Sequence, residues 1–196
     1  MLYYLVNKLM NKQMSENTLT NKNSLNLGPS GRAIAQEVDI NLLENLYQHL
    51  TMERNASVQY FSISLWFQER DLNGFSKFFL DESKSEMEHS YKFSNYLIAR
   101  GQTVKLQELP APTQNWTSIE ELISFAFNME ADLTTSLQQL YSLAERSSDT
   151  RTNVFLDPIV EAQIKSEDEF AHILGKVKFA SNQPSAILII DSDLDK

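Results

Sequence analysis

Apolar residues recur at alternating steps of three and four residues along four long stretches of the chain. This spacing keeps side chains on one face of an α-helix, so each stretch is predicted to be an amphipathic helix. The four predicted helices span residues 39–68, 71–100, 117–145 and 152–180, and residues 184–193 are expected to form a short fifth helix. Because the chain has only five Gly and five Pro and is rich in Leu, Glu and Gln, we predict an all-α protein.

Residues with known preferences for helix ends support these boundaries. Asp39 is placed to cap the N-terminus of the first helix, and Gly101 is placed to terminate the second. Residues 117–120 read Thr-Ser-Ile-Glu, which predicts a capping box at the start of the third helix. Pro158 predicts either a first-turn position after Asp157 or a kink in the fourth helix.

The lengths of the connections predict how the helices are arranged. Short links follow the first and third helices, so each is expected to form an antiparallel hairpin with the helix after it. Residues 101–116 form a long link that must run the length of the bundle. The chain is therefore predicted to be a four-helix bundle with one long crossover. Residues 1–32 are polar over most of their length and are predicted to be a flexible tail, with residues 33–193 as the single domain.

Polar residues interrupt the middle of every apolar stripe. They are Glu53 in the first helix, Glu82, Glu86 and His89 in the second, Glu130 in the third and Gln163 in the fourth. An unpaired carboxylate inside a protein costs several kcal/mol, and none of the four stripes carries Lys or Arg. A metal ion is the simplest counter-charge. The alternative is that the glutamates are protonated or face a wet cavity.

The spacing of these residues predicts that they meet at one level of the bundle. Glu53 and Glu86 are 33 residues apart, and so are Glu130 and Gln163. Two hairpins with equal separations and similar turns place their polar positions at similar depth. We therefore expect all four positions to converge.

The ligand types indicate iron or manganese. Glu86 and His89 lie one turn apart on one helix face, and the chain has no cysteine, so the site offers carboxylate and imidazole without sulfur. A second Glu-x-x-His, at Glu169 and His172, misses the stripe and is interpreted as a solvated or interface pair. His49 also misses its stripe and is predicted to lie on the surface. Only His89 is predicted to be a ligand.

Composition excludes several classes of partner. The formal net charge of −9 disfavours nonspecific binding to nucleic acid or anionic membranes. No apolar run approaches the roughly 20 residues needed to span a bilayer. The lack of cysteine excludes disulfides and thiol catalysis and fits a reducing compartment, so a cytoplasmic location is expected.

The polar constellation resembles the ferroxidase centre of non-haem ferritins. The matching features are Glu53 followed by Tyr60, Glu86-x-x-His89, Glu130 in Met-Glu-Ala-Asp and Gln163 in Glu-Ala-Gln. The resemblance covers residues 33–193 and is closest to the cyanobacterial type, through residues 53–57 and 149–158. It implies a ferritin-like bundle that assembles as a homo-oligomeric cage of 24 subunits. It also implies oxidation of Fe(II) by O2 and storage of Fe(III) as a mineral.

The resemblance assigns roles to the four residues nearest the two iron ions that it implies for each subunit. Glu53 and His89 would bind the first iron, and Glu130 the second. Glu86 would bridge the two. Both ions and O2 are substrates of the implied reaction.

Four further residues receive less direct roles. Gln163 would be a weak ligand or would hold a water or peroxide, and Tyr60 would hydrogen-bond a ligand carboxylate or donate an electron to O2. The alternative for Tyr60 is a half-buried core residue. Glu82 and Asp157 are candidates for passing iron to the centre, with a solvated helix end and an N-cap as their respective alternatives.

Some features of the sequence depart from common ferritins. Ser85 and Tyr91 stand where many members carry acids toward a third iron site; Glu88 and Glu167 are available instead, so the sequence leaves that site undecided. Met87 matches the haem-binding methionine of bacterioferritins, but the fourth helix offers Gln163 and Ser166 where those proteins have a second Glu-x-x-His. Haem is therefore not expected. The remaining alternative is a di-iron or di-manganese oxidase acting on another substrate.

Overall fold

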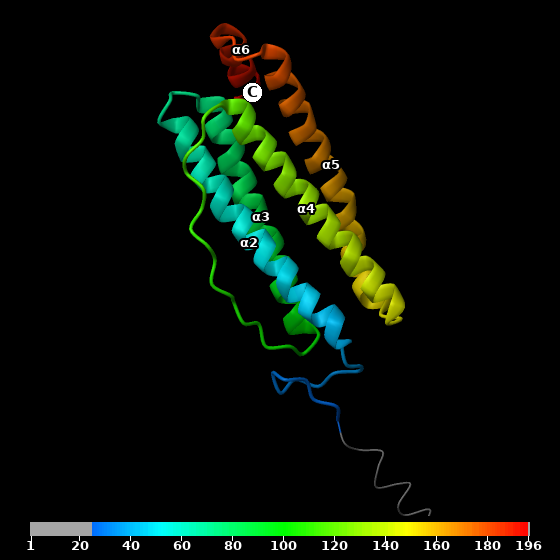
Figure 1. Ribbon diagram of the computed structural model, residues 1–196. Helices are drawn as coiled ribbons and strands as arrows, with labels where there is room; N and C mark the ends of the chain where they lie inside the picture. The colour runs from blue at the N-terminus through cyan, green and yellow to red at the C-terminus, as the bar shows by residue number, and fades with distance from the viewer. Residues whose placement is uncertain (1–24, 196) are drawn as a thin grey trace, which may run out of the picture.

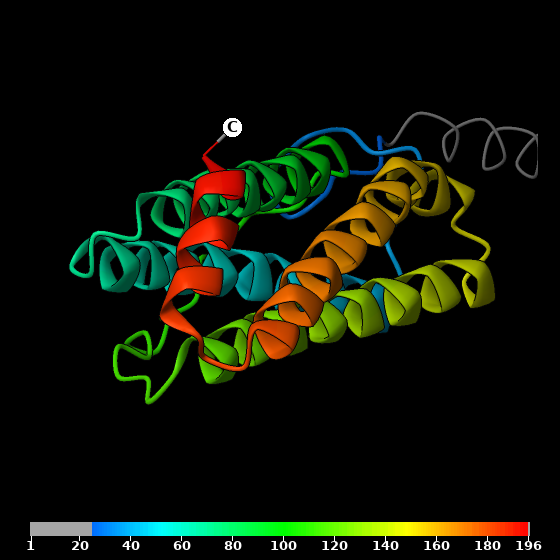
Figure 2. The same ribbon diagram turned by 90° about the horizontal axis from the view of Figure 1, so that it is seen from above.

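The computed structural model describes residues 25–195. The helices are α2 (Ile40–Gln68), α3 (Asn73–Ala99), α4 (Ile119–Arg146), α5 (Thr150–Ala180) and α6 (Pro184–Leu194). Helices α2 and α3 form one antiparallel hairpin, α4 and α5 form the other, and the long link between α3 and α4 runs along the outside of the bundle (Figure 1). Helix α6 crosses the end of the bundle (Figure 2). The predicted ferritin-like topology with one crossover is confirmed.

Most helix ends follow the sequence signals. The side chain of Asp39 accepts hydrogen bonds from the first turn of α2, and Gly101, with φ of +74°, ends α3 in the left-handed conformation that glycine adopts without strain. The predicted capping box is wrong by one residue. Ser118 caps α4 by accepting from the backbone N–H of Glu121, whose carboxylate accepts from the N–H of Thr117.

Helix α5 begins earlier than predicted. Asp149 is its N-cap and accepts a hydrogen bond from the backbone N–H of Thr152. Pro158 therefore lies inside the helix, and its first-turn placement is wrong. Proline lacks the N–H that would bond to the carbonyl of Val154, but both residues are exposed, so water can take the place of that bond.

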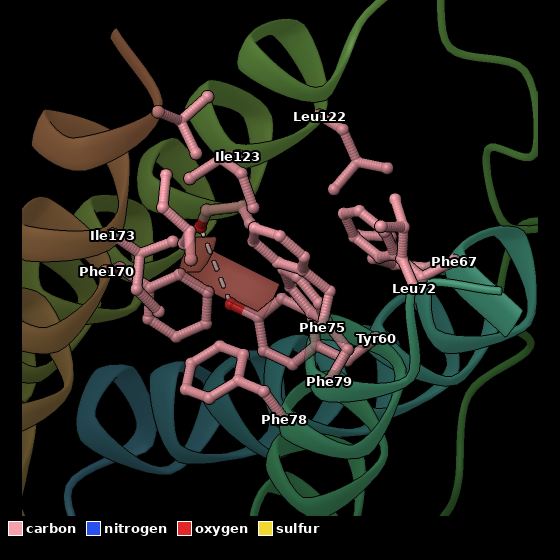
Figure 3. Packing of buried hydrophobic residues seen from close by; sticks show 14 of the residues in the cluster. Tyr60, Phe67, Leu72, Phe75, Phe78, Phe79, Leu122, Ile123, Phe170 and Ile173 are labelled. Atoms are coloured by element: carbon pink, nitrogen blue, oxygen red, sulfur yellow. Dashed lines mark hydrogen bonds between the residues drawn. The ribbon is translucent and has the colours of Figure 1, made fainter. Parts of the chain in front are cut away.

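Two apolar clusters fill the bundle. Glu53, Glu86 and Gln163 lie between them along their helices, whereas Glu130 is flanked on α4 by residues of one cluster. One cluster is rich in aromatic residues and lies toward α6; its rings include Tyr60, Phe67, Phe75, Phe79 and Phe170 (Figure 3). The other, mostly aliphatic, includes Leu46, Leu50, Phe93, Leu140 and Leu156. The polar level is therefore sealed from solvent at both ends of the bundle.

Two serines bring α2 and α3 close together near this level. The hydroxyl of Ser57 donates to the carbonyl of Ser83 (2.7 Å), and the hydroxyl of Ser83 donates to the carbonyl of Ser57 (2.8 Å). Such small side chains let the two backbones approach, and each hydroxyl finds a partner without water. The contact holds Glu53 and Glu86, which lie close to these serines in the sequence, on facing sides of the same hairpin.

Both ends of the described chain contact α3. Asp191 of α6 accepts a hydrogen bond from the N–H of Phe75 (2.9 Å), at the N-terminus of α3. At the other end, Ser30 donates to the carbonyl of Gly101 and Arg32 to that of Ile98. Residues 25–32, part of the predicted tail, thus make defined contacts, whereas residues 1–24 lie outside the described residues. The domain boundary at residue 33 stays a prediction.

Across residues 25–195, no helix combines the length and the apolar character required to cross a membrane.

Candidate metal centre

The four polar positions that the stripes predicted lie inside the bundle, one on each long helix. Glu53 on α2, Glu86 on α3 and Glu130 on α4 are at most 2 % exposed, and Gln163 on α5 is 7 % exposed. Glu53, Glu86 and Gln163 lie between the two apolar clusters, and Glu130 is level with Gln163, whose Nε2 donates to its Oε2 (2.8 Å). The equal separations in the sequence therefore predicted their depth correctly.

Glu53, Glu86 and His89 form a compact group of potential metal ligands. One ligand atom from each lies within 4.8 Å of the others. Nδ1 of His89 is 3.4 Å from Oε2 of Glu86 and 3.8 Å from Oε2 of Glu53. The latter oxygen is buried and has no hydrogen-bond partner in the part of the chain that the structure describes. A buried carboxylate oxygen without a partner, facing an imidazole and a second carboxylate, fits a divalent cation.

Glu130 lies in a different environment. Its Oε1 accepts a short hydrogen bond from the Tyr60 hydroxyl, and its Oε2 accepts one from Nε2 of Gln163 (2.8 Å). Tyr60 is fully buried, not half-buried, and its hydroxyl also lies 3.5 Å from the carbonyl of Ala126 (dashed line in Figure 3). Both oxygens of Glu130 therefore have neutral hydrogen-bond partners.

The pKa shifts indicate that this buried centre holds more carboxylates than can all stay charged without a cation. Burial raises the pKa of Glu86 to about 9, and the charges of Glu53 and Glu130 contribute. Burial also acts to raise the pKa of Glu53, but interactions with Glu86, His49 and His89 outweigh it and lower that pKa. Glu53 and Glu86 raise the pKa of His89 to about 10. Without a metal the centre holds protons, which a divalent cation can displace.

Burial raises the pKa of Glu130 as well, although the hydrogen bonds from Tyr60 and Gln163 act in the opposite direction. This carboxylate is thus also more basic than an exposed one, but two neutral donors moderate the effect.

The two candidates for iron transfer lie in different surroundings. Glu82 is partly buried one turn before Glu86, and burial, followed by the charges of Glu130 and Glu169, raises its pKa to about 7. Glu82 is therefore electrostatically part of the centre. Asp157 is exposed and accepts a hydrogen bond from the hydroxyl of Tyr141 (3.0 Å). It is not the N-cap of α5, so that alternative is wrong.

His49 is the residue that the sequence reasoning misplaced. It is fully buried, with Nε2 2.8 Å from Oε1 of Glu53 and Nδ1 2.9 Å from the hydroxyl of Ser136. The prediction of a surface position is wrong because a bundle helix buries more than one residue per turn, so the buried face is wider than the apolar stripe. Its spacing of four residues from Glu53, which places both side chains on one face, was the available signal. Glu169 and His172 are exposed, as predicted.

Comparisons with known proteins all point to the same family. A family model described as a ferritin-like domain matches residues 43–180. A ferritin of Pacifastacus leniusculus is 28 % identical over 155 residues, which cover 77 % of this chain and 86 % of the relative. Ferritin-1 heavy chain of Schistosoma mansoni is 33 % identical over 135 residues, covering 65 % of this chain and 78 % of the relative.

A prokaryotic relative and a solved structure extend the comparison. Bacterial non-heme ferritin of Bacteroides fragilis is 27 % identical over 147 residues, with 75 % of this chain and 91 % of the relative covered. An open pore ferritin from the archaeon Archaeoglobus fulgidus superimposes with a TM-score of 0.78 at 24 % identity, covering 81 % of this chain and 98 % of the other, a likeness of fold. The matched family model spans most of the bundle, and we conclude that the chain belongs to the ferritin family of iron-storage proteins.

Proposed function

We propose that this chain is a ferroxidase subunit of a ferritin cage, which oxidises Fe(II) with O2 between its four long helices and stores the Fe(III) inside the cage. The observation that carries the proposal is the group formed by Glu53, Glu86 and His89, with one ligand atom each within 4.8 Å, beside the buried Glu130. No Lys or Arg interrupts the four stripes, so Fe(II) would supply the missing positive charge.

The geometry supports one division of labour between two Fe(II) ions. Glu53 and His89 bind the first ion, since Nδ1 of His89 lies 3.8 Å from the Glu53 oxygen that has no hydrogen-bond partner among residues 25–195. Glu130 binds the second. Glu86 bridges the two, because it belongs to the same ligand group as Glu53 and His89 and the charge of the buried Glu130 also acts on it.

The chain's own residues manage charge during the reaction. Glu86 holds a proton in the metal-free protein and releases it when Fe(II) binds, so the bridging position becomes anionic only when cations are present. Two Fe(II) ions together give two electrons to O2, which takes up two protons and leaves as hydrogen peroxide, while two Fe(III) ions remain. Tyr60 and Gln163 hold Glu130 in place by their hydrogen bonds.

The wider proposal concerns assembly and iron supply. A homo-oligomeric cage follows from family membership, and we propose 24 subunits. Glu82 passes Fe(II) into the centre. Asp157, on α5, is a second residue that passes Fe(II) along. A cytoplasmic location is part of the proposal, since a cysteine-free chain suits a reducing compartment.

The decisive experiment adds Fe(II) aerobically to wild-type protein and to Glu86→Ala, with particle mass measured in parallel. Wild type should oxidise Fe(II) rapidly as a large cage. Glu86→Ala should keep the cage but lose at least about 100-fold in initial rate, because the bridging ligand is gone. Glu145→Ala, an exposed glutamate on α4, is the matched control and should behave as wild type.

Two results would contradict the proposal. If Glu86→Ala oxidised Fe(II) as fast as wild type, the reaction would occur elsewhere in the protein. A small oligomer in place of a large cage would favour the alternative, a soluble di-iron or di-manganese oxidase.

A further inference from the structure

His49 is held on three sides inside the bundle. It belongs to α2, its Nδ1 is 2.9 Å from the hydroxyl of Ser136 on α4, and its ring packs against Phe93 of α3 with 4.6 Å between centroids. The third contact is made by Nε2, which is 2.8 Å from Oε1 of Glu53. A side chain that contacts three helices at once has little freedom to move, so the position of its Nε2 is fixed by the fold.

This contact makes the two oxygens of Glu53 unequal. Oε1 lies against His49, whereas Oε2 lies on the side of His89 and has no hydrogen-bond partner among residues 25–195. Rotating the carboxylate to direct both oxygens at one metal ion would break the contact with His49. Nε2 of His49 is buried and makes no aligned hydrogen bond among residues 25–195, so this 2.8 Å contact is the interaction that the rotation would remove.

Ser136 favours one tautomer of His49 and so influences whether Nε2, the nitrogen next to the carboxylate of Glu53, carries a proton. A serine hydroxyl can donate to Nδ1, which leaves the proton of a neutral imidazole on Nε2, the nitrogen that lies 2.8 Å from Oε1 of Glu53. Without that hydroxyl the other tautomer becomes competitive, and it would set a lone pair against the carboxylate. Ser136 thus connects α4 to the ligand geometry of α2.

We propose that His49, fixed by Ser136, is a positioning residue that keeps Oε1 of Glu53 turned away from the first iron site, so that Glu53 binds Fe(II) through Oε2 alone. The inference rests on the proposed function, because it concerns how one of the proposed ligands is presented. A carboxylate that binds through one oxygen occupies one coordination position and leaves another free for O2 or water. His49 thereby keeps the first iron open to its oxidant.

The test is an anaerobic titration of the assembled protein with Co(II), whose visible absorption weakens as its coordination number rises. His49→Leu removes the nitrogen and keeps an apolar side chain. It should weaken the first Co(II) site about 10- to 100-fold, the usual effect of losing a group that orients a metal ligand. It should also lower the absorption per Co(II), because the second oxygen of Glu53 can then join the metal.

Three comparisons separate positioning from general damage. His49→Gln keeps an N–H donor near the place of Nε2 and should restore most of the affinity and the spectrum. Ser136→Ala should change the Co(II) affinity and the spectrum in the same direction as His49→Leu, but to a smaller extent. His172→Gln on α5 and Ser142→Ala on α4 change the same residue types at exposed positions and should leave the titration unaltered.

The inference is overturned if His49→Leu, with normal helix content and particle mass, binds Co(II) with wild-type affinity and spectrum. Should that variant fail to fold, Ser136→Ala decides the matter, and an unchanged spectrum there counts against the inference. Wild-type protein that takes up no Co(II) would instead refute the proposed function, and this inference with it.

Discussion

The two hairpins contribute unequally to the centre. The α2–α3 hairpin supplies Glu53, Glu86 and His89, with one carboxylate oxygen that has no hydrogen-bond partner in the described part of the chain. The α4–α5 hairpin supplies Glu130 and Gln163, and both oxygens of Glu130 already have neutral partners, one of them Tyr60 of α2. A cation thus meets open ligands on one side and ligands already engaged on the other. We expect the α2–α3 side to bind Fe(II) more tightly and the α4–α5 side to release its product more readily.

The largest expected effect comes from deleting a ligand on each side. Glu53→Ala should weaken binding of the first Fe(II) at least about 100-fold, since an open charged ligand is lost, whereas Gln163→Ala should weaken the second by at most about 10-fold. Anaerobic Fe(II) titration measures both. Equal losses in the two variants would show that the hairpins contribute alike.

The pH dependence of stability is the next largest effect. Between about pH 4.5 and 9, the folded protein keeps the proton of Glu86, which the unfolded chain has lost. The free energy of unfolding of the metal-free protein should therefore fall as pH rises through this range, by at most about 1.4 kcal/mol per pH unit for this group. The raised pKa of His89 acts in the same direction from about pH 6.5 to 10. Denaturant titrations at several pH values measure the slope.

Substitutions show which hairpin carries the groups that cause the free energy of unfolding to fall with pH. Glu86→Gln should flatten this slope most, and Glu130→Gln less, because the hydrogen bonds from Tyr60 and Gln163 oppose the rise in the pKa of Glu130. A slope that Glu86→Gln leaves intact would mean that other groups hold the protons.

A smaller effect is expected from the hydroxyl of Tyr60. Tyr60→Phe keeps the ring in the aromatic cluster but removes the donor to Oε1 of Glu130. Binding of the second metal ion should weaken several-fold, up to about 10-fold, while the first stays as in wild type. Separate Co(II) binding constants for the two sites test this. An effect confined to the first site would contradict the division between the hairpins.

The smallest effects are expected at the transfer residues. Glu82→Ala should slow Fe(II) oxidation a few-fold at low iron concentration, because the partly buried carboxylate is electrostatically coupled to the centre. Asp157→Ala should have less effect, since Asp157 is exposed and hydrogen-bonded to Tyr141. Stopped-flow measurements with the cage intact compare the two. Rates equal to wild type in both variants would remove these residues from the iron route.

Periodicity predicted the fold and the depth of the centre well. Each stripe marks the buried face of one helix, and equal separations of 33 residues brought Glu53 level with Glu86 and Glu130 level with Gln163. The long link at residues 101–116 predicted the crossover. These features are determined by the sequence because they depend on spacing within one helix or one hairpin.

The contacts between the hairpins were decided only in three dimensions. His49 shares no motif with Ser136, yet the packing of α2 against α4 brings them within 2.9 Å. The partner of Tyr60, left open by the sequence, is Glu130 for the same reason. Periodicity states which face of a helix is buried, but the neighbour of a side chain depends on how far each helix is rotated and shifted against the others. The packing of all the side chains together sets that rotation and shift.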